Sequence, residues 1–412
     1  MNVALFFARK MQGQKQNKST VSERIINIAT VAVAIGIAAI LIAIATSEGL
    51  QREIQKKTSV FNGHILVTPF ENNESQVSLL PFEDTPALRS QIKEEKNVDR
   101  IHSIVLKAGM LKTKNVFEGF LLKGVSDDFD WSSLSSFLTQ GTFPKLEKES
   151  VTNEILISET MADRLGIRLG QKVDAYFQNE SGEGLPNRRR FTVVGIYFSG
   201  FPDIDQNLIY GDLRQAQRLN RWSSNQIGGY ELFVNDFQDL DPTANRIYER
   251  LPSELNCSSI SERFSGIFQW IALFDFNVLI ILIVMLLVGI INMATALLVL
   301  ILERSRMIGL LKALGADNTL VQKIFLYNGT VIMSKGLFWG NLIGLGFYFS
   351  QQYWGWIQLD PETYFVNQAP VFISGFQVVF INLFFLGISI LLLWIPSKII
   401  LRIYPSEVLR FR

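Results

Sequence analysis

Long uninterrupted apolar segments divide the chain into stretches with two different patterns. No charged residue occurs between Ile25 and Ser47. At 1.5 Å per residue, this segment forms a helix long enough to cross a hydrocarbon core of about 30 Å. Three more apolar segments of similar length lie toward the C-terminus. The pattern predicts membrane-spanning helices at residues 25–47, 272–302, 324–350 and 372–395.

The first apolar segment has a second interpretation, as a signal peptide that is removed after export. Its apolar run is longer than the apolar region of a typical signal peptide. No cleavage site of small residues clearly ends the run before Glu48. We therefore favour a span that stays in the mature protein.

Positive charge flanks alternate ends of the four predicted spans. Lys and Arg occur in residues 1–24, 303–323 and 396–412, whereas residues 351–371 contain neither and are rich in Tyr and Trp. Basic flanks mark the cytoplasmic side, and interfacial aromatic residues suit the opposite side. We expect both termini and the link 303–323 to be cytoplasmic, with residues 48–271 outside the cytoplasm.

Residues 48–271 show the patterns of a folded α+β domain, most simply one of two lobes. Two segments, Ser158–Leu165 and Pro242–Leu251, have helical patterns, and Gly166 is a stop signal for the first. Five β-branched or aromatic segments predict strands, at 64–68, 117–122, 173–177, 191–195 and 230–234. The expected fold is an α-helical membrane protein with four transmembrane helices and a large α+β domain inserted between the first and second.

Composition excludes several classes of function. The chain has 39 Lys and Arg against 38 Asp and Glu, so no general positive field exists to hold a nucleic acid. A single cysteine, Cys257, excludes an internal disulfide framework and a cysteine-built metal site, and His64 and His102 are the two histidines. No phosphate-binding loop or hydrolase motif occurs. We predict a non-enzymatic subunit without cofactor or metal, whose energy source lies on another chain.

The link between the second and third spans carries an apolar stripe. Met307, Leu310, Leu311 and Leu314 have the spacing of one helical face, and Gly315 is suited to end the helix. Such a stripe requires a partner. Periodicity alone leaves two alternatives open, since the helix could lie on lipid headgroups or dock against a protein.

Small and polar residues interrupt the apolar spans at five notable positions. Gly336, Gly340 and Gly344 form two consecutive G-x-x-x-G steps, which let helices approach closely within one subunit or between two. Lys335 lies in the same span, and we favour a side chain that reaches back to the interface. Asn292 is predicted to form a hydrogen bond between helices.

A loop in the outer domain separates two predicted strands and ends in three arginines. Gly182, Gly184 and Pro186 prevent a regular continuation of the strand, and Arg188, Arg189 and Arg190 concentrate positive charge where the chain returns. A solvated hairpin and a partner-binding loop remain equal alternatives from these residues.

Several stretches, in this order and with this topology, resemble one family. They are Phe6–Lys10, Gly49 with Phe61–Ile65, Arg189–Gly195 with Ser199–Phe201 and Asp205, Glu303–Gly315 and Pro405–Arg410. Together they resemble the FtsX/MacB-like ABC transporter permeases, and specifically the lipoprotein-releasing LolC/LolE branch. The resemblance covers nearly the whole chain.

The resemblance implies a permease in the bacterial inner membrane that rests on a cytosolic ABC ATPase dimer, where ATP and Mg²⁺ bind. A second permease subunit, identical or related, completes the complex. The link 303–323 then holds the ATPase-coupling helix, with Arg304, Met307, Ile308, Leu310, Leu311, Leu314 and Gly315 as coupling residues. Relatives usually carry Glu at the place of Met307, which alters a polar contact but leaves the stripe intact.

The resemblance also implies a function. The permease would couple ATP hydrolysis to the extraction of lipoproteins from the outer leaflet of the inner membrane and pass them to a periplasmic chaperone. The loop from Asn179 to Arg190 is similar to the loop of LolC that recruits this chaperone, but is shorter. The alternative is a mechanotransmission permease of another branch, which exports small molecules or controls a cell-wall hydrolase.

Overall fold

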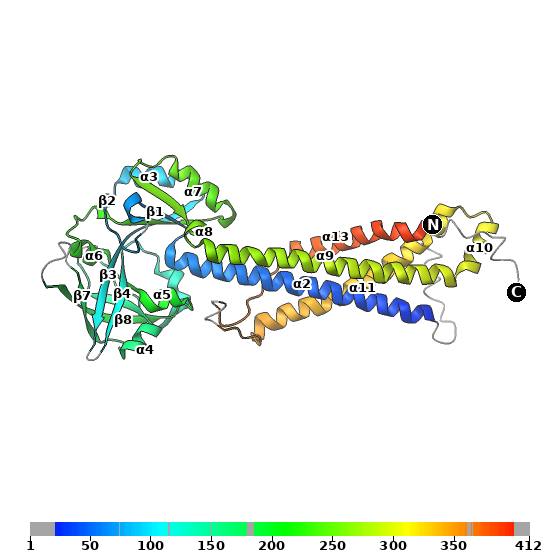
Figure 1. Cartoon of the computed structure of the whole chain (residues 1–412), viewed down its shortest axis with the longest axis horizontal. Coiled ribbons are helices and arrows are strands. Elements are labelled where there is room, and N and C mark those ends of the chain that lie inside the picture. Colours follow the sequence, from blue (N-terminus) through cyan, green and yellow to red (C-terminus); the bar gives the residue numbers. More distant parts are fainter. Residues whose placement is uncertain are drawn as a thin grey trace. The chain divides into compact units, whose positions relative to one another are not determined.

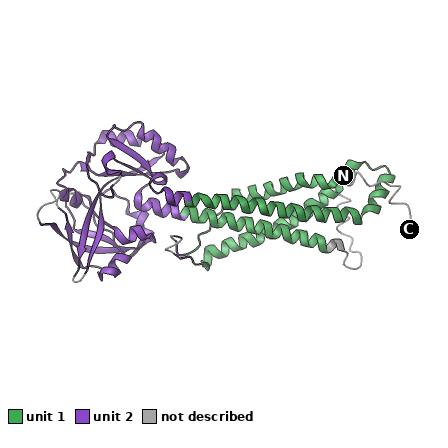
Figure 2. Cartoon of the chain, viewed as in Figure 1, with its two compact units in different colours: residues 1–52, 270–358, 368–412 green, residues 53–269, 359–367 purple. Residues whose placement is uncertain are grey.

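The structure is a computed structural model that describes residues 21–73, 75–113, 116–148, 150–178, 185–360, 364 and 366–398. The chain forms two compact units (Figure 2). The helical unit consists of residues 1–52, 270–358 and 368–412, and the α/β unit of residues 53–269 with 359–367. Most of the two predicted cytoplasmic ends, 1–24 and 396–412, lies outside the described residues.

Four long helices and a short one build the described part of the helical unit (Figure 1). Their packed sides share one apolar core, to which Val33, Ile37, Met293, Phe325 and Phe385 contribute buried side chains. The helices are α2 (Val21–Asn62), α9 (Ser265–Glu303), α10 (Ser305–Ala313), α11 (Asn318–Trp354) and α13 (Gly375–Ser397).

Three of these helices, α2, α9 and α13, are long and apolar enough to cross a membrane. They contain the predicted spans 25–47, 272–302 and most of 372–395. Helix α11 has 37 residues, but Asn328, Ser334, Lys335 and Asn341 interrupt its apolar sequence. The span at 324–350 therefore stays a prediction, because length alone does not establish it.

The glycines of α11 pack against α2 of the same chain. A Cβ atom on Gly340 would lie 2.7 Å from the carbonyl oxygen of Ala34, and one on Gly336 would lie 2.7 Å from Cβ of Val33. Gly344 has a similarly tight neighbour on α2. Of the two alternatives for this glycine face, the structure shows packing within one subunit, which small residues permit by allowing close backbone approach.

The polar bridge between helices uses a different asparagine from the predicted one. Asn292 makes no side-chain hydrogen bond to any residue that the structure describes. Instead, Asn341 on α11 and Asn382 on α13 pair reciprocally, with Nδ2 to Oδ1 distances of 2.6 and 2.9 Å. Lys335 lies on the exposed side of α11.

The α/β unit is an α+β fold, as the sequence predicts. Its helices are α3 (Pro86–Lys93), α4 (Glu159–Leu165), α5 (Pro202–Asn207), α6 (Leu213–Leu219), α7 (Leu240–Tyr248) and α8 (Ile260–Arg263). Its strands are β1 (Ile65–Pro69), β2 (Phe82–Glu83), β3 (Val98–Lys112), β4 (Phe117–Val125), β5 (Leu138–Gly141), β6 (Glu154–Ser158), β7 (Lys172–Phe177), β8 (Asn187–Tyr197), β9 (Leu208–Asp212), β10 (Gln226–Ile227), β11 (Gly229–Val234) and β12 (Leu255–Ser259).

Six of these strands close into a barrel. The pairing runs β3–β4–β9–β6–β8–β7 and returns from β7 to β3. Strand β3 also pairs through its first half with β11, which continues to β1 and β12. We call β12, β1, β11 and the first half of β3 the wing. The barrel and the wing share β3, so one long strand joins the two parts of the sheet.

The local signals in the sequence account for five of the strands and two of the helices in this unit. All five predicted strands lie in or overlap β1, β4, β7, β8 and β11, and the second predicted helix is α7, displaced by about two residues. Helix α4 begins where the Ser158 hydroxyl accepts a hydrogen bond from the Met161 amide, 3.1 Å away. It ends at Gly166, whose φ of 65° favours glycine.

Substitution of the α11 glycine face should loosen the helical unit. We expect Gly340→Val to lower the free energy of unfolding by about 1–3 kcal/mol, because the added atoms would overlap the backbone of α2. Gly346→Val is the matched control, since its Cβ would meet no atom within 4 Å. Thermal unfolding of both variants in detergent measures the difference, and equal melting temperatures would contradict the assigned packing.

Candidate functional site

The C-terminal end of helix α2 is buried in the α/β unit and is held there by two cations. Lys123 Nζ on β4 donates a hydrogen bond to the Phe61 carbonyl oxygen, 2.8 Å away. Arg263 Nη2, at the end of α8, donates to the Asn62 carbonyl oxygen at 2.7 Å. The last carbonyls of a helix lack partners within the helix and form the negative end of its dipole, so both cations stabilise it. We call this arrangement the joint.

A buried carboxylate completes the joint. Glu231 on β11 accepts a hydrogen bond from Lys123 Nζ at 2.6 Å, and both side chains are almost fully buried. Burial lowers the pKa of Lys123, and Glu231 opposes that shift. Burial likewise lowers the pKa of Arg263 to about 10, again against the attraction of Glu231. The single carboxylate therefore supports a buried lysine and a partly buried arginine at the end of α2.

Glycine and aromatic residues shape the joint around the helix end. Gly63 has a φ of 67°, which reverses the chain directly after α2. A side chain there would also meet Glu231, since a Cβ atom would lie 2.8 Å from Cβ of Glu231. Phe61 is buried in a separate apolar core, with ring centroids 5.1 Å from Phe137 and 5.6 Å from Tyr197.

Two of the stretches that carried the family resemblance form defined turns in the structure. Phe61–Ile65 contains the helix end and its reversal at Gly63. In the other stretch, the Asp205 carboxylate accepts hydrogen bonds from the backbone amides of Ser199 and Gly200, at 2.9 and 3.0 Å. Asp205 thereby fixes the turn between β8 and α5. The sequence analysis missed Lys123 and Glu231, although each is a charge among mostly apolar residues of its strand.

A helix, α10, lies where the apolar stripe predicts one, but only part of the stripe is exposed. Helix α10 ends in a Schellman motif, in which the Ala316 amide bonds the Leu311 carbonyl at 2.9 Å and Gly315 has a φ of 90°. Ile308 is 0% exposed and lies in the core of the helical unit, so it anchors the helix. Leu310 and Leu314 are 52% and 84% exposed.

Among the other residues predicted to contact the ATPase, some help to anchor the helix and others stay partly accessible. Met307 packs partly against the core of the helical unit, and Leu311 is half-buried. Arg304 precedes the helix, and its Nε atom is buried without a hydrogen-bond partner among the described residues. Sequence periodicity placed Met307 and Leu314 on one face, whereas the structure turns the first inward and leaves the second exposed.

The arginines after the outer loop do not form one positive patch. Side chains alternate along a strand, and Arg188 and Arg190 on β8 both bond Asp174 of β7, at 2.7 and 2.9 Å. Hydrogen bonds from Arg190 and Arg188 lower the pKa of Asp174 to about 2. Arg189 points to the opposite face. Asn179, Gly182 and Gly184 lie outside the described residues, and Pro186 is exposed.

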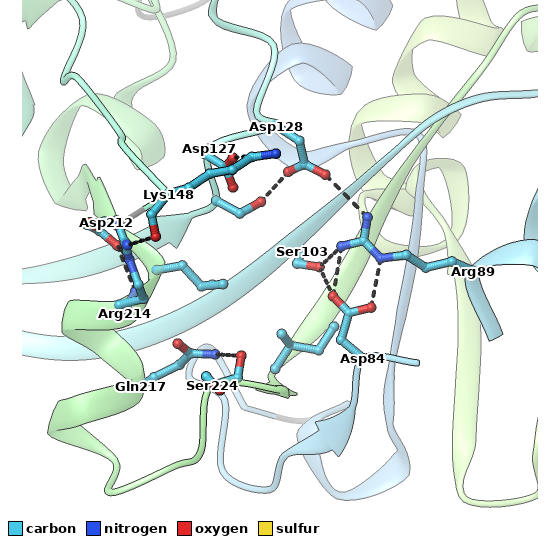
Figure 3. A pocket seen from close by; sticks show the side chains of 13 residues that line it. Asp84, Arg89, Ser103, Asp127, Asp128, Lys148, Asp212, Arg214, Gln217 and Ser224 are labelled. Atoms are coloured by element: carbon cyan, nitrogen blue, oxygen red, sulfur yellow. Dashed lines mark hydrogen bonds and ion pairs between the residues drawn. The ribbon is translucent and has the colours of Figure 1, made fainter. Parts of the chain in front are cut away.

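A charged pocket of about 370 Å³ lies beside α3 and α6, but its charges are paired with one another (Figure 3). Arg89 makes two 2.7 Å contacts with Asp84 and another contact with Asp128. Burial raises the pKa of Asp84, but hydrogen bonds from Arg89, Tyr230 and Ser103 outweigh it and hold that pKa below its usual range. These contacts attach α3 to the sheet. Nowhere in the described chain do three or more ligating side chains gather as a metal site.

Comparison with known proteins identifies the family. The profile of the MacB-like periplasmic core domain matches residues 28–249, more than half of the chain, and that of the FtsX-like permease C-terminal domain matches residues 279–405. The chain belongs to the MacB/FtsX-like family of ABC transporter permeases. Members are inner-membrane permeases with a periplasmic domain, and the α/β unit is that domain.

Three relatives show how far the similarity of the permease extends. The lipoprotein-releasing system transmembrane protein LolE of Haemophilus influenzae is 22% identical over 99% of both chains. LolC of the same organism is 22% identical over 93% of both chains. The macrolide export ATP-binding/permease protein MacB of Bdellovibrio bacteriovorus is 24% identical over 76% of the permease and 50% of its own length.

Removal of one charge from the joint should destabilise the permease more than removal of two. Lys123→Met leaves Glu231 buried without a partner, which costs about 3–5 kcal/mol of stability. The double variant Lys123→Met with Glu231→Leu replaces the pair by apolar side chains and should recover part of that loss. The rest remains, because the Phe61 carbonyl still lacks its donor and Arg263 loses the attraction of Glu231. Denaturant unfolding of the purified permease compares the three proteins. Equal losses in the single and double variants would show that the two charges do not interact.

The pH dependence of the free energy of unfolding should depend on His102, a buried group next to the joint. His102 pairs with Glu231 across the strands, and burial lowers its pKa to about 4. The unfolded state, with a pKa near 6.5, binds the proton first, so stability falls as pH decreases from about 6.5 toward 4, by at most about 1.4 kcal/mol per pH unit for each such histidine. Burial also lowers the pKa of His64 to about 4, so His102→Phe should reduce this slope without abolishing it. An unchanged slope in unfolding experiments across that pH range would refute the assignment.

Proposed function

We propose that the permease couples ATP hydrolysis on a separate cytosolic ABC ATPase dimer to the extraction of lipoproteins from the outer leaflet of the inner membrane. A periplasmic chaperone then receives the lipoprotein. Similarity to two relatives named as parts of a lipoprotein-releasing system, over at least 93% of each chain, supports this substrate class. ATP and Mg²⁺ bind the ATPase in this scheme and not the permease.

Extraction of a lipoprotein requires work, and one continuous helix offers a route for it. Each buried methylene of an acyl chain contributes about 0.8 kcal/mol to membrane anchoring, so spontaneous release is negligible. Helix α2 has Val33 and Ile37 in the core of the helical unit and Phe61 in a core of the periplasmic domain. A movement of the lower part of α2 therefore acts on the sheet through the joint. This unbroken helix, fixed at its end, is the observation that carries the proposal.

The exposed end of α10 supplies the contact with the ATPase in this proposal. Leu310 and Leu314 lie one helical turn apart and are exposed, whereas Ile308 holds the helix to the bundle. A nine-residue helix is too short to be stable alone. Its attachment lets a force on the leucines reach the spans. In this proposal the link 303–323 and both termini lie in the cytoplasm.

Helix α9 supplies a surface for the second permease, whether identical or related. Only 6% of its most apolar segment is buried within the chain, against 50% for α2. Its exposed apolar residues recur every three or four positions and include Phe276, Leu279, Ile283, Leu287 and Ile291. One part of this surface would contact the second permease and the remainder would contact lipid.

The loop between β7 and β8 is the proposed contact for the chaperone. Its described base projects Pro186 and Arg188 outward, and Asp174 neutralises part of the positive charge there. The net positive charge that an acidic partner would meet is therefore smaller than the arginines in the sequence suggest. The proposal keeps Asn179 to Arg190 as the contact segment.

Charges placed on the exposed face of α10 should separate the permease from its ATPase. We expect Leu310→Asp with Leu314→Asp to abolish copurification of the ATPase, because each aspartate would have to be desolvated in an apolar contact. Leu169→Asp with Tyr248→Asp is the control, since it alters two exposed side chains of the periplasmic domain. A pull-down in mild detergent measures the association, and undiminished copurification would remove the coupling role of α10.

The same double variant also tests the substrate class. When it replaces the native permease in cells, lipoproteins should accumulate in the inner membrane, as fractionation by density measures. Normal lipoprotein sorting combined with a drug-export or division defect would instead favour the alternative branch of mechanotransmission permeases. The control variant should leave lipoprotein sorting unchanged.

A further inference from the structure

A wide cleft lies on the uncovered face of the wing. Helix α7 packs against the other face, where Val67 and Cys257 are buried. On the cleft side, Leu66 and Thr68 of β1 and Ser258 of β12 are only partly buried. The cleft encloses about 750 Å³, which is toward the upper end of the range for sites that bind small ligands. It is therefore large enough for several residues of a peptide.

Three segments form the walls of the cleft, and at least one is fixed in advance. They are residues 72, 73, 75 and 76 of one loop, helix α5 and the joint, which contributes Asn62 and Arg263. Asn72 holds the loop, since its Oδ1 accepts hydrogen bonds from the amides of Leu79 and Leu80 at 2.9 and 3.0 Å. The cleft therefore has a preformed wall, which lowers the entropic cost of binding.

The lining combines apolar side chains with carboxamides and few charges. Leu66, Leu106 and Leu121 form an apolar floor next to the core around Phe61. Of the described residues, three charged ones line the cleft, Asp203, Glu262 and Arg263. The carboxamides are Asn62, Asn72, Asn73, Gln76, Asn207 and Asn256.

This chemistry distinguishes between possible ligands. Carboxamides offer both donors and acceptors, as a peptide backbone requires. Asn72 already uses both within the chain, and Nδ2 of Asn62 and of Asn256 also bonds the chain. Within the described residues, Gln76 and the Oδ1 atoms of Asn62 and Asn256 are therefore among the groups left for a ligand. An acyl chain would leave these remaining polar groups desolvated without partners. A phosphate headgroup would need several cations, but among the described residues of the lining Arg263 is the single cation, and it already bonds the Asn62 carbonyl. The lining therefore matches a polypeptide of low charge better than a lipid.

We propose that this cleft binds an extended, weakly charged peptide segment of the transported protein. Under the proposed function, on which this inference rests, the segment is the one that follows the lipid anchor of the lipoprotein. Asn62 and Arg263 belong both to the cleft and to the joint. A bound peptide therefore contacts the groups through which α2 acts on the periplasmic domain.

Photocrosslinking on the full-length permease in nanodiscs tests the site without any ATPase. Benzoylphenylalanine replaces Thr68 on the cleft floor or, as the control, Tyr248, which is exposed on α7. The probes are a short uncharged peptide, the same peptide with an N-terminal diacylglyceryl cysteine, and diacylglyceryl cysteine alone. We expect both peptide probes to crosslink at position 68 and neither at 248. Crosslinking of the lipid alone at 68 would overturn the proposal, as would absence of peptide crosslinking there.

Variants that fill the cleft complete the test. Ser258→Trp on the floor and Gln76→Trp on the exposed wall should each weaken binding of the labelled peptide by about tenfold or more, whereas Tyr248→Trp should not. Gln76 is exposed, so its variant remains informative if Ser258→Trp fails to fold. Undiminished binding to Gln76→Trp and to any folded Ser258→Trp would overturn the proposal. Because this assay needs no ATPase, its result is independent of whether α10 couples the permease to one.

Discussion

The structure depends on how the last turn of α2 ends inside the periplasmic domain. A helix that stops in an apolar interior leaves its final carbonyls without hydrogen bonds, and each such group costs about 1–3 kcal/mol. Lys123 and Arg263 satisfy the carbonyls of Phe61 and Asn62, and the charge of Glu231 makes it possible to bury both cations. Without these groups, α2 would have to end at the surface of the domain, and its movement would reach the sheet only through a flexible segment.

A joint of this kind favours a fixed geometry over maximal stability. Apolar side chains of similar volume often replace a buried ion pair without loss of stability. They could not accept or donate the hydrogen bonds that end a helix, however, and they would not define where it ends. The positive φ of Gly63 and its contact with Glu231 add a second constraint at the same point. The direction of the chain after α2 is therefore determined by the same carboxylate that holds the two cations.

The sequence predicts elements better than it predicts partnerships between them. The ends of α4 at Ser158 and Gly166 could be predicted because helix capping depends on neighbouring residues in the sequence. The joint was not, because Lys123 and Glu231 lie 108 positions apart and meet only when β4 and β11 flank β3. Periodicity likewise predicted a helix at α10, but whether Ile308 or Leu314 faces the bundle depends on its angle to α11. For the same reason the sequence did not identify the bridging asparagine. Several polar residues occur in the spans, and only the packing of the helices determines that Asn341 forms the bridge.

The two ends of the proposed relay differ in a way that suits their roles. At the periplasmic end, the contacts are polar, buried and specific, so the angle between α2 and the sheet is held closely. At the other end, α10 is attached to the bundle mainly by Ile308 and exposes Leu310 and Leu314. Apolar contacts are not directional, so a partner can rotate on these leucines while still transmitting a push. A relay with one rigid end and one that tolerates rotation can receive varied movements from an ATPase and deliver a single movement to the periplasmic domain.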